Sequence, residues 1–192
     1  GFLNRFARFR YSAMLHGSEI LFFRRSRPLN LAMLGNPFFG AAKICTNSRF
    51  TAELLFKNYP RIPKALVHIA YLGVDDYWFG KGFQDRHIVL QRLGIPAGRK
   101  IVLSVGRLHP RKGQGRCIAA LSRLGDHLRK EVVYVVVGPA IDAEYVTELK
   151  QAAGKADFPV VLTGAISDED LRALYGASTV FCLPSQTHDT KV

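Results

Sequence analysis

Residues 101–113, with the sequence IVLSVGRLHPRKG, run from an apolar segment into a basic turn that contains two glycines. The apolar part predicts a strand, and residues 115–124 after the turn predict a helix. Glycines let the backbone approach a ligand closely, and a helix start offers unpaired N–H groups and the positive end of a dipole. Arg107 and Lys112 add full charges on opposite sides of the turn. The turn is therefore predicted to hold a phosphate group.

The spacing of this turn excludes two common phosphate-binding motifs. A P-loop needs Gly-Lys followed by Ser or Thr, whereas Gly113 is followed by Gln114. The G-x-G-x-x-G fingerprint of dinucleotide-binding proteins does not fit the turn either. Taken alone, the run is equally compatible with an arginine-rich loop between a strand and a helix, so its interpretation depends on the rest of the chain.

Strand-like and helix-like segments alternate along the whole chain. The predicted strands occupy residues 11–15, 43–46, 66–70, 101–105, 132–137, 160–162 and 179–183. The predicted helices occupy residues 18–34, 48–58, 86–93, 115–124, 143–153 and 168–175. The later strands are continuous apolar runs, as expected for strands that are buried on both faces. This pattern predicts an α/β protein with doubly wound parallel sheets.

A segment rich in Gly, Asp and aromatic residues, at 73–84, separates the two halves of the chain. We assign 1–75 to the second half of one Rossmann-like domain, 76–99 to an interdomain connection with a lead-in helix, and 100–192 to the first half of a second Rossmann-like domain. Because the chain opens without methionine and stops just after a strand and a loop, we expect it to be an internal piece of a longer protein.

The composition is that of a soluble globular protein, with 48% hydrophobic and 22% charged residues, which argues against disorder. No apolar run reaches transmembrane length, and no signal peptide is recognisable at the start. The three cysteines, Cys45, Cys117 and Cys182, lie far apart in the sequence without metal-ligand spacing. We expect buried free thiols in a reducing compartment.

The net charge of +12 is concentrated near the start, where residues 1–64 hold eleven lysines and arginines against two acidic residues. A basic region of this kind attracts phosphates of nucleic acid, anionic lipid or nucleotides. Phenylalanines interleaved with the arginines also suit an anionic membrane surface. The alternative is that the rings are core residues and the arginines are solvated. The phenylalanines concerned are Phe2, Phe6, Phe9, Phe22 and Phe23.

Five segments together resemble a known enzyme family. They are H-G-x-E at 16–19, S-R-F-T at 48–51, G-V-D at 73–75, G-R-L-x-x-R-K-G at 106–113 and L-T-G-x-x-x-D-E-x-L-x-x-L-Y at 162–175. In this order they resemble the retaining glycosyltransferases of family four, which have the GT-B fold. The resemblance is greatest to the phosphatidylinositol mannosyltransferase branch and its bacterial hexosyltransferase relatives.

The resemblance implies two Rossmann-like domains and a nucleotide-diphosphate sugar bound mainly by the second. It implies transfer of a hexose to a lipid-linked or glycan acceptor with retention of configuration, and no metal or other cofactor. GDP-mannose is the first candidate donor, while UDP- and ADP-linked sugars stay open. The expected location is cytoplasmic, with peripheral binding at the inner face of the cytoplasmic membrane. Because the family's acidic motif would lie beyond Val192, we expect the piece alone to be inactive.

The resemblance also assigns the site residues. Arg107 and Lys112 match the pair that clamps the donor diphosphate, and Gly164 with Ile166 matches a turn that contacts the nucleobase. His16 matches a histidine that reaches the transferred sugar. There it would position and stabilise the sugar rather than act as a general base. Three further residues at predicted strand ends, where open α/β sheets bind ligands, are assigned to donor binding. They are Gly106, Pro184 and Ser185.

Three side chains close in sequence to the assigned residues receive no chemical role. Glu19 is expected to cap the helix that follows it. Arg111 is expected to be solvated, and no role is assigned to His109.

Three other functions compete with sugar transfer. The charge alone would suit a nucleic-acid-binding protein, but no helix-turn-helix, aromatic RNP-like pair or zinc pattern supports one. A nucleotide-sugar epimerase or a phosphorylase can share the fold, since fold does not decide function. An interaction module with a decayed site is disfavoured because His16, Arg107 and Lys112 are intact.

Overall fold

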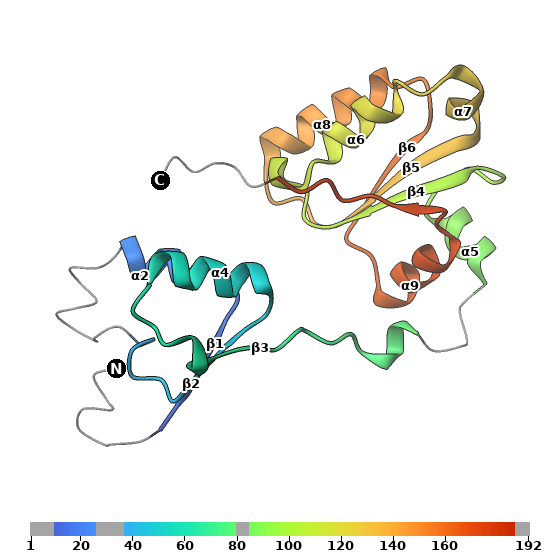
Figure 1. Ribbon diagram of the computed structural model, residues 1–192. Coiled ribbons are helices and arrows are strands. Elements are labelled where there is room, and N and C mark those ends of the chain that lie inside the picture. Colours follow the sequence, from blue (N-terminus) through green and yellow to red (C-terminus); the bar gives the residue numbers. More distant parts are fainter. Residues whose placement is uncertain (1–9, 26–36, 80–84, 187–192) are drawn as a thin grey trace. The chain divides into compact units, whose positions relative to one another are not determined.

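The structure is a computed structural model that describes residues 10–25, 37–79 and 85–186 (Figure 1). It divides into two compact units, Gly1–Asp76 and Tyr77–Val192. Each unit is an α/β layer structure with its own parallel sheet. The alternation of strands and helices predicted from the sequence is therefore confirmed in both units.

The first unit has a parallel three-stranded sheet in the order β1-β2-β3. Its strands are β1 (Ser12–Leu15), β2 (Lys43–Thr46) and β3 (Val67–Ile69), and its helices are α2 (Ser18–Arg25), α4 (Arg49–Asn58) and the short 3-10 helix η1 (Lys64–Leu66). The helices α2 and α4 lie side by side over the sheet (Figure 1). Ile20 of α2, Ile44 of β2 and Leu55 of α4 are fully buried in the core between them.

Local signals explain where these elements begin and end. The sequence offers Asn47 or Ser48 as the cap of α4, and the Ser48 hydroxyl takes the role by accepting a hydrogen bond from the Thr51 backbone N–H at 3.1 Å. The helix predicted at 18–34 is present as α2 up to Arg25, and its remainder lies outside the described residues. The strand predicted at 66–70 is shorter than expected, because Lys64–Leu66 forms a 3-10 turn after Pro63.

The second unit has a parallel four-stranded sheet in the order β6-β5-β4-β7. Its strands are β4 (Lys100–Val105), β5 (Val132–Val137), β6 (Val160–Gly164) and β7 (Val180–Phe181). Its helices are α5 (Arg86–Arg92), α6 (Gln114–Leu121), α7 (Asp126–Glu131), α8 (Ala143–Lys155) and α9 (Asp168–Ala177), with the 3-10 helix η3 (Pro110–Lys112). The 3-10 helix η2 (Asp76–Trp78) includes the last residue of the first unit and the first two residues of the second. One face of the sheet carries α6 and α8, and the other carries α5 and α9 (Figure 1).

The strand β5 shows why these runs are apolar throughout. All six of its residues are buried. Val132, Tyr134 and Val136 face the cluster under α6 and α8, and the residues between them, Val133, Val135 and Val137, face the cluster under α5 and α9. Successive side chains of a strand point to opposite faces, so a strand covered on both sides is apolar at every position. The doubly wound arrangement predicted for this half is confirmed.

Three short helices, η2, α7 and η3, were not predicted. The helix α7 has the sequence DHLRKE, which carries no apolar stripe of helical period. The 3-10 helix η3 lies inside the basic turn and begins at Pro110, whose fixed φ suits a first helical position. Because of η3, the chain makes an extra turn between β4 and α6, and α6 begins at Gln114.

The cysteines differ from the expectation of separate buried thiols. All three are free, but only Cys117 is fully buried. Cys182, after β7, lies with its Sγ atom 3.3 Å from the Sγ atom of Cys117 in α6, although the two are 65 residues apart. Burial, together with the neighbouring Cys117 thiol, raises the pKa of Cys182 to about 11. The Cys182 thiol therefore stays protonated near neutral pH.

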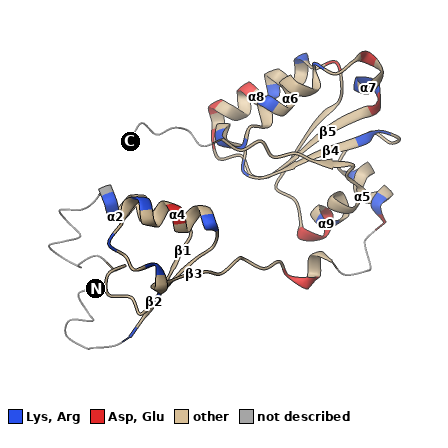
Figure 2. Cartoon of the chain, viewed as in Figure 1, with Lys and Arg blue, Asp and Glu red and all other residues tan. Residues whose placement is uncertain are grey.

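The phenylalanines of the basic region behave in two ways. The Phe22 ring is 62% exposed, whereas the Phe23 ring packs edge-on against Phe38 at a centroid distance of 5.4 Å. Figure 2 shows Lys and Arg positions on both α2 and α4. Phe2, Phe6 and Phe9 lie outside the described residues. The core interpretation thus holds for Phe23 but not for Phe22.

Candidate functional site

A cavity of about 340 Å³ opens in the second unit at the carboxyl ends of its parallel strands. Its wall comes from three segments: the basic turn after β4, the loop after β5 and the segment after β7. The lining residues are Arg107, His109, Arg111, Lys112, Ile141, Ser185 and Gln186. Ligands of open α/β sheets bind at such strand ends, where the direction of strand addition reverses. Here the reversal lies at β4, with β5 on one side and β7 on the other.

Glycines bring the loops after β4 and β5 together. The Gly106 N–H donates to the Val137 carbonyl at 2.8 Å, and the Leu108 N–H donates to the Pro139 carbonyl at 2.9 Å. Gly138, at a φ of +147°, packs so tightly that a Cβ there would overlap the Gly106 carbonyl oxygen. Only glycine fits this approach without strain. The contact holds Arg107 on one loop beside Ile141 on the next.

The segment after β7 closes the cavity against the basic turn. Gly113 has a φ of +73°, and a Cβ at this position would overlap the Pro184 carbonyl oxygen. The Gln186 N–H donates a hydrogen bond to the Arg111 carbonyl at 2.8 Å. Ser185 thereby lines the cavity, whereas Pro184, also assigned to donor binding from the sequence, packs over Gly113 outside the lining.

Three cations line the cavity, Arg107, Arg111 and Lys112. In the described parts of the chain, no carboxylate forms an ion pair with any of the three, and no acidic residue lines the cavity. Arg111 is exposed, as expected, but it also contributes to the cavity wall. A concave surface that carries charge of one sign focuses an attractive field on an anion. The cavity is therefore suited to an anion of more than one charge.

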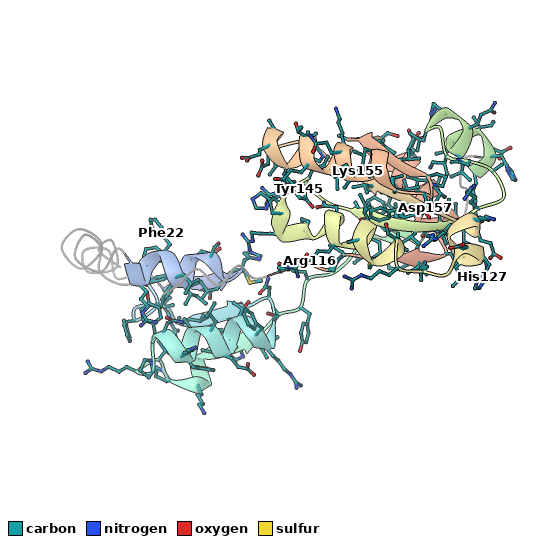
Figure 3. The ribbon with its side chains drawn as sticks, turned by 90° about the horizontal axis from the view of Figure 1, so that it is seen from above. Phe22, Arg116, His127, Tyr145, Lys155 and Asp157 are labelled. Atoms are coloured by element: carbon teal, nitrogen blue, oxygen red, sulfur yellow. The ribbon has the colours of Figure 1, made fainter. Side chains whose placement is uncertain are left out.

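A buried amide holds the backbone of the turn. Gln114 is completely buried, and its Nε2 donates to the Arg107 carbonyl oxygen at 3.0 Å. The Tyr145 hydroxyl donates to Gln114 Oε1 at 3.3 Å and accepts from the Gly115 N–H at 3.0 Å. Figure 3 shows Tyr145 at the start of α8, beside the beginning of α6. Burial raises the pKa of the Tyr145 hydroxyl, so it stays a donor.

Sequence reasoning missed Gln114 and Tyr145. Gln114 follows the turn glycine and lies on the buried face of α6 with Cys117 and Ile118. A polar residue on an otherwise apolar buried face is the signal that could have drawn attention to it, because buried amides are hydrogen-bonded. Its partner on α8 is 31 residues away, and no sequence pattern identifies it.

Gly164 and Ile166 lie at the end of β6, outside the cavity lining. Gly164, at a φ of +73°, accepts a hydrogen bond from the Gly138 N–H at 2.9 Å, which continues the row of glycine contacts along the strand ends. The Ile166 side chain packs with Leu171 against the core under α9. Ser167 between them caps α9 through the Asp170 N–H at 3.2 Å. Ile166 thus serves as the hydrophobic staple of α9.

His16 belongs to the first unit, where it follows β1 and is exposed. The Glu19 carboxylate accepts hydrogen bonds from the His16 N–H at 3.2 Å and the Gly17 N–H at 2.9 Å. Bonds from backbone N–H groups, first that of Glu19 itself, hold the pKa of the Glu19 carboxyl below its ordinary value. Glu19 therefore caps the start of α2, as expected, and fixes the backbone that carries His16.

Residues 10–25, 37–79 and 85–186 hold no group of three His, Cys, Asp or Glu side chains placed to bind a metal ion. Over the same ranges, every helix is too short or too polar to cross a membrane.

The chain is similar in sequence to known proteins of mycobacteria. It is 29% identical over 151 residues to alpha-maltose-1-phosphate synthase of Mycobacterium tuberculosis, covering 75% of this chain and 38% of that protein. It is 30% identical over 125 residues to the GDP-mannose-dependent alpha-(1-6)-phosphatidylinositol monomannoside mannosyltransferase of Mycolicibacterium smegmatis, covering 65% of this chain and 32% of that protein. The chain thus spans about a third of the length of these relatives.

The crystal structure of the Anabaena protein HepE in complex with UDP-glucose superposes with a TM-score of 0.73 at 24% identity. The match covers 96% of this chain and 49% of that one. The structural neighbours are GT-B glycosyltransferases, so the α/β GT-B fold class predicted from the sequence is confirmed. The family described as "Glycosyl transferases group 1" matches residues 85–190, which include every residue of the cavity wall. The chain belongs to the glycosyl transferases group 1 family.

Proposed function

We propose that the full-length protein transfers a hexose from a nucleoside-diphosphate sugar to an acceptor, and that the cavity beside β4 receives the donor diphosphate. The observation that carries this proposal is the set of three cations on the cavity wall, Arg107, Arg111 and Lys112, which no carboxylate of the described residues neutralises. A diphosphate carries more than one negative charge, which these cations can neutralise. Membership of the family supports the same choice of ligand.

The cations would act on the leaving group. When the bond between the anomeric carbon and the diphosphate breaks, the diphosphate gains negative charge. Fixed cations at that oxygen stabilise the transition state more than the ground state, which is what accelerates a reaction. Arg107 offers a planar pair of N–H donors, and Lys112 offers a point charge. The Gln114 bond to the Arg107 carbonyl supports preorganisation of this arrangement.

The finer parts of the proposal concern the donor. We propose transfer with retention of configuration and mannose as the first sugar to test, supported by the GDP-mannose-dependent relative. The UDP-glucose bound to HepE keeps a UDP-linked hexose as the alternative. His16 would contact the transferred sugar, and the backbone at Gly164 and Ile166 would lie near the nucleobase. Three lining cations also support binding of the diphosphate without a metal ion.

The acceptor is proposed to be lipid-linked or a glycan, reached at a membrane surface. Two features support a lipid surface: the excess of cations in residues 1–64 and the 62% exposure of the Phe22 ring. The relative that acts on a phosphatidylinositol monomannoside supports a lipid acceptor as well. Co-sedimentation of the full-length protein with anionic and neutral vesicles tests this part, and equal binding to both would contradict it.

The central experiment is a thermal-shift panel on the full-length protein with UDP, GDP, ADP and their glucose and mannose derivatives. A ligand that binds only the folded state raises the melting temperature. We expect one nucleotide series to do so, with and without EDTA, and NMR of the transfer product to show the anomeric configuration of the donor. If no nucleotide of the panel shifts the melting temperature, the proposed function is wrong.

A further inference from the structure

We propose that His109 is a ligand of the donor diphosphate, in which the Nε2–H group of its ring donates a hydrogen bond to a phosphate oxygen. This inference rests on the proposed function, because it takes the cavity as the diphosphate site. It adds a residue that neither the sequence motifs nor the family match assigns. Its basis is the hydrogen bond that the ring accepts from the Arg111 backbone N–H and the place of His109 in the cavity wall.

The structure determines which ring nitrogen carries the proton. His109 precedes the 3-10 helix η3 as its N-cap, and its Nδ1 accepts a hydrogen bond from the Arg111 backbone N–H at 3.1 Å. An accepting nitrogen offers its lone pair and carries no proton. In a neutral imidazole the other nitrogen is then the donor, so the proton of His109 is on Nε2.

The Nε2–H group has no acceptor among the described residues. In the described part of the chain, the only hydrogen bond of the His109 side chain is the one at Nδ1. The half-buried ring lines the same cavity as Arg107, Arg111 and Lys112. A polar donor that is partly withdrawn from water gains most from a charged acceptor, since hydrogen bonds to ionised groups are the stronger ones.

The chemistry of capping explains why a histidine suits this position. Side chains that commonly cap a helix start are those of Ser, Thr, Asp and Asn. Aspartate at position 109 would put a negative charge among three cations and oppose an anion. Serine or asparagine would cap but would not extend further into the cavity. Histidine caps through one nitrogen and presents a donor on the opposite side of the ring, without adding a full charge.

Two substitutions separate the donor from the cap. His109→Asn keeps an acceptor for the Arg111 N–H but removes the Nε2–H group. His109→Gln keeps an N–H donor at about the reach of Nε2 but is a poorer cap. His109→Ala removes both. Each variant is made in the full-length protein, and its thermal unfolding reports the loss of the cap independently of ligand binding.

Calorimetric titration with UDP, GDP and ADP, and with uridine, guanosine and adenosine, gives the affinities. We expect His109→Asn and His109→Ala to weaken the preferred nucleoside diphosphate about tenfold, as for loss of one hydrogen bond to a charged group. His109→Gln should retain affinity closer to wild type, and the matching nucleoside, which lacks phosphate, should bind all variants equally.

Four outcomes would overturn the proposal, and the last of them would overturn the proposed function as well. If His109→Asn binds the nucleoside diphosphate as tightly as wild type, the ring only caps η3. If nucleoside and nucleoside diphosphate weaken in parallel, His109 does not contact phosphate. If His109→Ala binds the nucleoside diphosphate with the same affinity as wild type, the inference fails while the proposed function stands. Absence of wild-type binding to all three diphosphates would overturn both.

Discussion

The side-chain amide of Gln114 donates a hydrogen bond to the carbonyl oxygen of Arg107 at 3.0 Å. The bond joins the two ends of the basic turn, because Arg107 follows β4 and Gln114 begins α6. Tyr145 of α8 completes the arrangement by bonding both Gln114 and the Gly115 N–H. A cation whose backbone is fixed loses less freedom when it binds an anion than one on a loose loop. Three predictions concern this turn, and a fourth concerns the first unit.

The first prediction concerns Tyr145→Phe. The change leaves the Gly115 N–H and Gln114 Oε1 without their partner, and a buried unsatisfied polar group costs about 1–3 kcal/mol. We expect the free energy of unfolding in denaturant to fall by that amount, and kcat of transfer to fall while KM for the donor changes less. Lys150→Ala, at an exposed position of the same helix, is the control. Unchanged stability and kcat in the Tyr145 variant would exclude a positioning role.

The second prediction concerns the cations themselves. Arg107→Ala and Lys112→Ala are each expected to lower kcat by about 10²- to 10³-fold, the usual effect of removing one group that stabilises developing charge. Both side chains lack ion pairs within the described residues, so the melting temperature should change little. Arg116→Ala is the matched control, since Arg116 is an exposed arginine of α6 outside the cavity lining (Figure 3). Full activity in the Arg107 or Lys112 variant would remove the clamp assignment.

The third prediction compares two glycine-to-alanine changes with opposite expected signs. In Gly113→Ala the new Cβ would overlap the Pro184 carbonyl oxygen, and alanine would have to adopt the φ of +73°. The variant should therefore lose roughly 1–3 kcal/mol of stability and bind nucleoside diphosphate more weakly. Gly154→Ala adds a methyl group in open space on α8 and should gain about 0.5–1 kcal/mol. Chemical denaturation measures both. A neutral Gly113 variant would mean that the segment after β7 moves aside without loss.

The fourth prediction concerns pH and Glu19. Its folded-state pKa lies below the ordinary 4.5 because backbone N–H groups bond the carboxylate. A lowered pKa means that the stabilising effect is complete above the unfolded-state value and is lost as the pH falls through the folded-state value. We therefore expect the difference in melting temperature between wild type and Glu19→Gln to be largest at pH values above the ordinary pKa of 4.5 and to shrink as the pH falls below it. A difference that does not vary with pH would contradict this account of the cap.

Local patterns predicted most of the elements. The continuous run of β5 predicted a strand covered on both faces, and the capping residues Asn47 and Ser48 predicted the start of α4. The sequence alone indicates the basic turn as the centre of a site, although the contacts assigned to the turn, and those assigned to His16, Gly164 and Ile166, stay predictions. Such features depend on period, capping and glycine, which a sequence displays directly.

Contacts between distant residues were not predictable in the same way. Gln114 meets Tyr145, and Cys117 meets Cys182, because the β4–β5 and β4–β7 pairings bring their segments together. The 3-10 turn η3 was missed because three residues are too few to show a period. The capping bond of His109 is a product of that turn, so the role that we infer for the ring could not be anticipated from the sequence.

The register between β7 and β4 sets the position of the chain segment that forms the third wall of the cavity. Val180 lies opposite Val102 and Phe181 opposite Leu103, and four residues later the chain reaches Ser185. A strand that slips by one residue turns every side chain to the opposite face of the sheet, so the smallest slip that keeps the faces is two residues. Such a slip would carry Ser185 roughly 7 Å along the sheet, away from the arginine and lysine side chains that line the rest of the cavity. Two pairs of residues at the edge of a sheet thus determine whether the third wall of an anion site is in place.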